Sequence, residues 1–151
     1  MKFVKFAASV SAVLAAVAFT ACDDSSSSPS DDGKVSYDCS VTDGVKVAYP
    51  KGGESFKIGD TVTVIYGTDV EDSGYRFMLM ADENDTGLDM LDASIDPKYL
   101  DGKTCNEQKV VISLDYLPEG VELPLAEAHI RVAPYTKTAK GSNSGTFKVT
   151  E

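Results

Sequence analysis

The residues of this chain whose side chains could do chemistry are few, and they match no catalytic pattern. His129 is the only histidine, and no motif places a serine and an acid around it, as a Ser–His–Asp hydrolase would require. Residues 141–145 read GSNSG, which differs from the nucleophile elbow G-x-S-x-G at its central residue, Asn143. We therefore expect a hairpin loop there, no catalytic residues and a protein that is not an enzyme.

Metal ligands are equally sparse. Two distant cysteines and one histidine lack the ligand spacing of a zinc site. Asp82-x-Asn84-x-Thr86-Gly87 resembles the first half of a calcium-binding loop, which has oxygen ligands at alternate positions and a glycine at the sixth. The twelfth position should be a bidentate glutamate, but it is Ala93. The prediction is a solvated acidic turn, with calcium as the alternative, and neither a metal nor another cofactor is expected.

The N-terminus has the layout of an export signal. Lys2 and Lys5 form a positive region, and Phe6 to Phe19 is an uncharged run rich in alanine and valine. This run suits the core of a signal peptide and falls short of the roughly 20 residues that span a bilayer.

The apolar run closes with Phe19-Thr20-Ala21-Cys22, which resembles the lipobox of bacterial lipoproteins. The resemblance implies a signal peptide over 1–21, cleavage after Ala21, and a lipid on Cys22 as the first mature residue. Each buried methylene contributes about 0.8 kcal/mol, so two or three acyl chains such as palmitate anchor a protein stably, whereas one alone is marginal. The alternatives are an ordinary secretory signal with an unrelated cysteine and a retained transmembrane helix.

With Cys22 assigned to the lipid, Cys39 and Cys105 remain as an even pair in an exported chain. Exported cysteines usually pair, so we predict a disulfide between them. The loop that it closes is long, and the chain-entropy model puts its stabilisation at about 4 kcal/mol. Two separate buried thiols are the alternative.

Charge and composition separate a tether from a folded part. The formal net charge is −10, and loss of the leader with its two lysines leaves −12. A chain this acidic lacks the basic face that nucleic acid requires, and direct contact with an anionic bilayer is disfavoured in the same way. Residues 23–32 read DDSSSSPSDD, without a hydrophobic anchor. We therefore predict the lipidated cysteine and a disordered Ser/Asp-rich tether over 22–38, then one domain over 39–151.

The domain is patterned as short strands separated by turns, and no long stretch shows the helical period apart from one turn near 97–100. Strands are expected within 41–49, 61–66, 74–80, 109–114, 129–132 and 146–150. Alternation places the following side chains inward: Val62, Val64, Tyr66, Tyr75, Phe77, Leu79, Ile130, Val132, Phe147 and Val149. His129 and Arg131 are expected to point outward. Six or seven strands predict an all-β, antiparallel β-sandwich.

Both ends of the domain resemble one known family. Residues 50–66 read PKGGESFKIGDTVTVIY, and 130–132 and 142–149 read IRV and SNSGTFKV. These stretches look like the Kre9/Knh1-type immunoglobulin-like domain of fungal wall proteins and bacterial surface proteins. The middle does not match, and Tyr66 stands where members often carry tryptophan. The resemblance implies an immunoglobulin- or fibronectin-III-like sandwich and carries no catalytic residue.

The segment 81–105, between the matching ends, is long for a connection and strongly acidic. Loops on a rigid scaffold are where binding usually evolves, so we expect specificity there. Met78 and Met80 fall on the face opposite Phe77 and Leu79. Either this segment covers the two methionines or they form a surface for a partner.

The whole sequence predicts a lipid-anchored protein of the bacterial cell envelope, on its periplasmic face or outer surface. Its non-catalytic β-sandwich would serve binding, adhesion or assembly, with an envelope protein or polysaccharide as partner. One alternative is a carbohydrate-binding accessory module of a surface polysaccharide-degrading system, which a row of solvent-facing tyrosines would favour. Tyr49, Tyr66 and Tyr75, however, are expected in or near the core. The other is a small hydrolase, which a cleft joining His129 to a serine and an acid would favour. The ligand, the membrane and leaflet, and the oligomeric state stay open.

Overall fold

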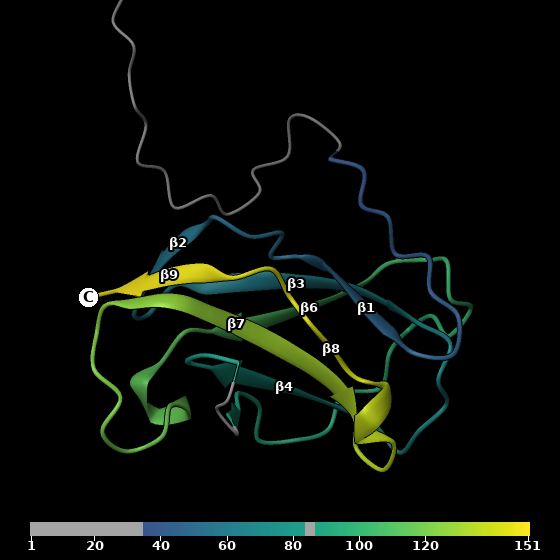
Figure 1. Ribbon diagram of the computed structural model, residues 1–151. Helices are drawn as coiled ribbons and strands as arrows, with labels where there is room; N and C mark the ends of the chain where they lie inside the picture. Colours follow the sequence, from purple (N-terminus) through teal and green to yellow (C-terminus); the bar gives the residue numbers. More distant parts are fainter. Residues whose placement is uncertain (1–34, 84–86) are drawn as a thin grey trace, which may run out of the picture.

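The computed structural model describes residues 35–83 and 87–151 (Figure 1). The predicted leader, Cys22 and the tether up to residue 34 lie outside the described residues, as do residues 84–86 of the calcium-type motif. The described part is an all-β sandwich of two sheets, as predicted. Within these two ranges, no helix is long and apolar enough to cross a membrane.

The smaller sheet has the strand order β1-β3-β6, and its strands are antiparallel. The strands are β1 (Val45–Tyr49), β3 (Thr61–Thr68) and β6 (Asn106–Val111). The central strand β3 is rich in β-branched and aromatic residues, which favour a pleated, half-buried surface. Since β6 is the last strand in this order, its outer edge has no strand partner among the described residues.

The larger sheet has the order β2-β9-β7-β4-β5, and β8 also pairs with β7. Its strands are β2 (Ser55–Lys57), β4 (Tyr75–Met80), β5 (Leu88–Asp89), β7 (Leu125–Pro134), β8 (Ser142–Asn143) and β9 (Phe147–Thr150). All pairs are antiparallel except β2 with β9. The 3-10 turns η1 (Leu114–Tyr116) and η2 (Thr138–Lys140) follow β6 and β7, and residues 97–100 form no helical turn. Figure 1 shows β7 and β9 in the nearer layer and β6 in the more distant one.

One apolar core fills the space between the two sheets. The Tyr66 ring of β3 meets the Phe77 ring of β4 edge-on, with ring centroids 5.4 Å apart, an arrangement that aromatic pairs prefer. The inward assignments are confirmed, because all of these side chains are buried in the core: Val62, Val64, Tyr66, Tyr75, Phe77, Leu79, Ile130, Val132, Phe147 and Val149.

The predicted disulfide between Cys39 and Cys105 is present and fastens the smaller sheet across its central strand. Cys39 precedes β1 and Cys105 directly precedes β6, and these strands flank β3. The two Cα atoms are 5.3 Å apart, within the usual range for a disulfide. Gly67 of β3 lies under Cys39, since a Cβ added to Gly67 would fall 1.9 Å from the Cys39 carbonyl oxygen. The segment at Cys39 therefore crosses β3 at a glycine, where β3 has no side chain.

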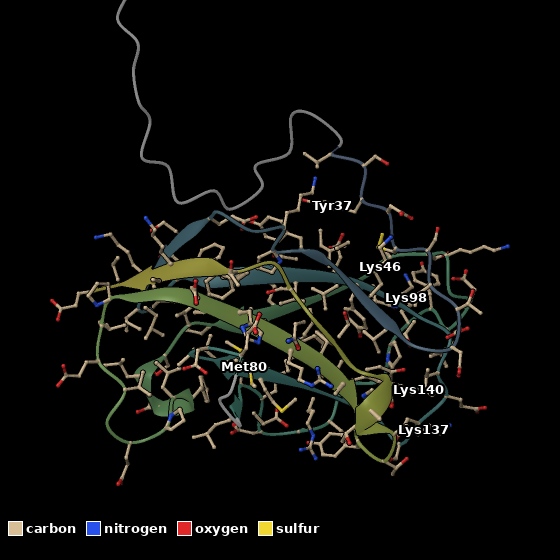
Figure 2. The ribbon with its side chains drawn as sticks, viewed as in Figure 1. Tyr37, Lys46, Met80, Lys98, Lys137 and Lys140 are labelled. Atoms are coloured by element: carbon tan, nitrogen blue, oxygen red, sulfur yellow. A yellow bond between two sulfur atoms is a disulfide. The ribbon has the colours of Figure 1, made fainter. Side chains whose placement is uncertain are left out.

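The chain is attached to the domain from Tyr37 onward. The Tyr37 ring meets the Tyr49 ring edge-on at 5.9 Å, and Lys51 Nζ lies 5.0 Å from the Tyr37 ring centroid. Asp38 accepts a hydrogen bond from Lys46 Nζ at 2.5 Å. Figure 2 shows Tyr37 and Lys46 on the side where the chain enters the domain. Tyr37 and Asp38, which the sequence assigns to the tether, thus contact β1 and the turn after it.

Candidate functional site

A groove of about 560 Å³ opens beside the disulfide, and we call it the β6 groove. Part of its lining comes from residues 95–99, within the acidic segment that the sequence singled out. The rest comes from residues 104–108, which include the start of β6, and from Tyr66. The half of the acidic segment nearest Cys105 is therefore built into a concave surface.

Asn106 joins the two walls of the β6 groove. Its side-chain Oδ1 accepts a hydrogen bond from the Tyr99 backbone N–H at 2.8 Å, and its Nδ2 donates to the Tyr99 carbonyl at 2.8 Å. The amide thus pairs with Tyr99 as a neighbouring strand would. Asn106 is buried, and its two bonds satisfy a polar group that would otherwise be costly to bury. This contact fixes the position of Tyr99 relative to the edge strand.

Asp101 organises the turn that leads into the groove. Its carboxylate accepts hydrogen bonds from the Thr104 hydroxyl at 2.6 Å, the Thr104 N–H at 2.6 Å and the Lys103 N–H at 2.8 Å. These bonds, that from the Thr104 hydroxyl first, lower the pKa of Asp101 from 3.8 to about 2. Gly102, at φ +65°, donates to the Thr68 carbonyl at 3.0 Å and so ties the same turn to β3.

The turn at Asp101 should loosen only in strong acid. Because the folded carboxyl has a pKa of about 2 and the unfolded one about 3.9, its stabilising contribution is complete above the unfolded value. That contribution is lost as the pH falls through the folded pKa. We expect the backbone N–H signals of Lys103 and Thr104 to titrate in NMR spectra with a midpoint near 2. The titration should vanish in Asp101→Asn, and a midpoint near 4 would show that the carboxylate is not held as described.

The groove presents an aromatic ring among polar groups. Tyr99 is 36% exposed, and Lys98 Nζ lies 5.0 Å from its ring centroid. Asp96, Glu107 and Gln108 add carboxylate and amide groups to the lining. Figure 2 shows Lys98 at the end of the sandwich opposite the C-terminus. The described lining of the groove thus combines one aromatic ring with charged and amide groups.

The outer edge of β6 is the second feature of the groove. An edge strand offers unpaired backbone N–H and C=O groups to which an extended chain can add. Glu107 and Lys109 are exposed along β6, and charges of this kind are the usual protection against pairing with a second copy. The groove therefore has a strand edge without a strand partner among the described residues, flanked by charged side chains.

His129 lies on the outer face of β7, as predicted, but it is buried there. β7 turns His129 to the face opposite Ile130, as alternation requires, yet His129 is only 2% exposed. Among the described residues, no serine or acid is hydrogen-bonded to either ring nitrogen of His129. The hairpin loop predicted for residues 141–145 is wrong in part, because Ser142–Asn143 form strand β8 and pair with β7. Ser144, in the same motif, accepts a hydrogen bond from the Ile130 N–H at 3.0 Å and donates to the Gly145 carbonyl at 2.8 Å. These contacts are structural.

The tyrosines of the strands are confirmed as parts of the core. Tyr66 and Tyr75 are buried and Tyr49 is half-buried. The Tyr75 hydroxyl donates to the Val70 carbonyl at 2.5 Å and also contacts the Thr68 hydroxyl at 2.8 Å. These three positions therefore supply no row of stacking rings on a sheet. Tyr99 was not anticipated, because a loop carries it and no strand pattern marks it.

Met78 and Met80 are buried, which confirms that the following segment covers their face. A Cβ added to Gly87 would lie 2.3 Å from Met80 Sδ, so this glycine sits directly on the second methionine. Among the described residues, no three histidine, cysteine, aspartate or glutamate side chains gather where they could hold a metal ion. The middle of the calcium-type motif lies outside the described residues.

Comparison with known protein families, with curated proteins and with solved structures finds no match to this chain.

Proposed function

We propose that this protein is anchored in the bacterial cell envelope by lipid on Cys22 and that its β-sandwich is a non-catalytic binding module. The observation that carries the binding role is the β6 groove, where the exposed Tyr99 ring is held against an edge strand. The Cys39–Cys105 disulfide supports an exported protein, because disulfides persist in oxidising compartments.

The N-terminal sequence supports the anchor. Export signals with a small residue before a cysteine are typical of lipoproteins, and Ala21-Cys22 fits that pattern. The domain's contacts begin at Tyr37, which leaves residues 23–36 as the connection to the lipid. A segment of this length spans at most about 50 Å when fully extended. The groove would therefore work close to the membrane surface.

The strand order supports an immunoglobulin-like assignment. Immunoglobulin-type sandwiches pair a sheet of strands A, B, E and D with a sheet of strands C, F and G. In this reading β1-β3-β6 corresponds to A, B and E, and β9-β7-β4 corresponds to G, F and C. Proteins with this architecture commonly act as binding and adhesion modules. That analogy rests on the fold alone, and the β6 groove supplies the particular surface that we propose for binding.

The ligand that we propose is an extended segment of another envelope protein. Such a segment would add to the outer edge of β6 through backbone hydrogen bonds and pack a side chain against Tyr99. An envelope polysaccharide is the second candidate, because an exposed aromatic ring beside Asp96 and Gln108 can stack on a sugar and hydrogen-bond its hydroxyls.

Removing the Tyr99 ring should weaken partner capture. We expect Tyr99→Ala to reduce capture from detergent-solubilised envelopes by roughly 30-fold, the equivalent of about 2 kcal/mol for a central aromatic contact. The melting temperature should change little, since Tyr99 is partly exposed. The matched control is Leu114→Ala, which removes a 50% exposed side chain in η1. Equal capture by both variants would contradict the proposal, and treating captured material with protease or glycosidase would separate the two ligand classes.

A further inference from the structure

The outer face of the larger sheet gathers two methionines and the only histidine of the chain. Met78 and Met80 lie two residues apart on β4, on the face opposite Phe77 and Leu79. His129 on β7 is the cross-strand partner of Met80. Directly opposed residues have Cβ atoms about 4.5–5.5 Å apart and diagonal ones about 7–8 Å apart. Two thioethers and one imidazole therefore share one small patch.

This patch is shielded from water. Met78, Met80 and His129 are 9%, 6% and 2% exposed. A Cβ added to Gly87 would lie 2.3 Å from Met80 Sδ and 3.3 Å from Met78 Cβ, so the backbone at Gly87 closes over both methionines. Figure 2 shows Met80 beside β7, the strand that carries its cross-strand partner His129.

The imidazole in this patch is chemically unsatisfied. Both ring nitrogens of His129 are buried, and neither has a hydrogen-bond partner within the described ranges 35–83 and 87–151. Buried polar groups are nearly always paired, because leaving one unpaired forfeits its interaction with water. A neutral imidazole without a hydrogen-bond partner has a free nitrogen lone pair, which is what a metal ion requires of it.

The nearby cations are directed elsewhere. Arg131, the partner of Met78 on β7, donates from Nη1 to Asn143 Oδ1 at 2.9 Å and from Nη2 to the Thr138 carbonyl at 3.1 Å, on the side of β7 away from β4. Arg76 lies over the Tyr135 ring, with its Cζ 4.5 Å from the ring centroid. Neither guanidinium is directed at the patch.

We propose that Met78, Met80 and His129 form a binding site for a soft monovalent metal ion, Cu(I). Thioether sulfur is a soft ligand that selects Cu(I), and imidazole binds copper readily. The three ligands are neutral, so the set does not supply the thiolates that structural zinc prefers or the oxygens that calcium and magnesium require. This role is independent of the β6 groove, which lies beside the smaller sheet.

Ag(I) is the probe that tests the site, because it has the same softness as Cu(I) and does not change oxidation state. The full chain should carry Cys22→Ala in every sample, so that the remaining cysteines are the disulfide pair and no thiol captures the metal. We expect one Ag(I) per chain, a higher melting temperature, and shifts of the single imidazole signal and of two methionine methyl signals in NMR spectra. Cu(I), supplied with a competing chelator, should give the same stoichiometry, and Zn(II) should give no response.

Variants assign the ligands. Losing a residue that only supports a metal ligand weakens metal binding by roughly 10–100-fold. Met78→Leu, Met80→Leu and His129→Leu each remove a direct ligand, so each should weaken Ag(I) binding by more than that. Leucine nearly preserves the volume of methionine, so the two methionine variants remain informative even where His129→Leu fails to fold. Met90→Leu, in the core between the sheets, is the matched control and should bind as the parent does. Absence of 1:1 binding, or binding that these three variants leave unchanged, would overturn the proposal.

Discussion

Replacing Cys39 and Cys105 together with alanine is expected to lower the free energy of unfolding by about 4 kcal/mol. The disulfide closes a loop with a sequence separation of 66 residues, and the chain-entropy model assigns about this much to a loop of that length. The loss is large beside the roughly 5–15 kcal/mol that stabilises a typical domain. Urea denaturation at constant temperature measures it, and the double variant should unfold at a clearly lower urea concentration than the parent.

Reductant provides the control for this prediction. Adding a reductant should shift the parent protein to the midpoint of the double variant and should leave the double variant unchanged. If the parent and the double variant unfolded at the same urea concentration, the cross-link over β3 would not be a source of stability.

Cys22→Ala is expected to move nearly all of the protein from the membrane fraction to the soluble fraction. The reason is the proposed anchor, since two or three acyl chains hold a protein stably whereas the acidic chain itself has no attraction to an anionic bilayer. Metabolic labelling with a fatty acid should also disappear. Fractionation of cells followed by detection of the protein measures both effects.

The disulfide variant is the matched control for the anchor. The double variant Cys39→Ala/Cys105→Ala also removes cysteines but keeps Cys22. The share of the folded variant found in the membrane fraction should therefore equal that of the parent. Unchanged detergent partitioning of Cys22→Ala would contradict lipid attachment at this residue.

The strands and the core could be predicted because alternation is a local property of the sequence. Val62, Val64 and Tyr66 recur at the two-residue period of a strand with one buried face, and their burial follows from that pattern. The disulfide could be predicted for a different reason, since it followed from assigning the third cysteine to the lipid. Neither inference depends on which strands are neighbours in the sheets.

The β6 groove could not be predicted, because it depends on contacts between residues that alternation does not relate. Nothing local shows that the Asn106 side chain will pair with the backbone of Tyr99. The burial of His129 was missed for the same reason. Alternation placed His129 correctly on the outer face of β7, but that face is covered. Met80 lies opposite His129 because of the register between β4 and β7, and alternation within one strand does not give that register.

Photo-crosslinking in the native envelope tests the proposed binding module most directly. The lipidated protein would carry Tyr99→p-benzoylphenylalanine, and a control would carry Leu114→p-benzoylphenylalanine. The groove proposal predicts a discrete crosslinked product in the membrane fraction from position 99 and none from position 114. No product from position 99, or the same products from both positions, would contradict it.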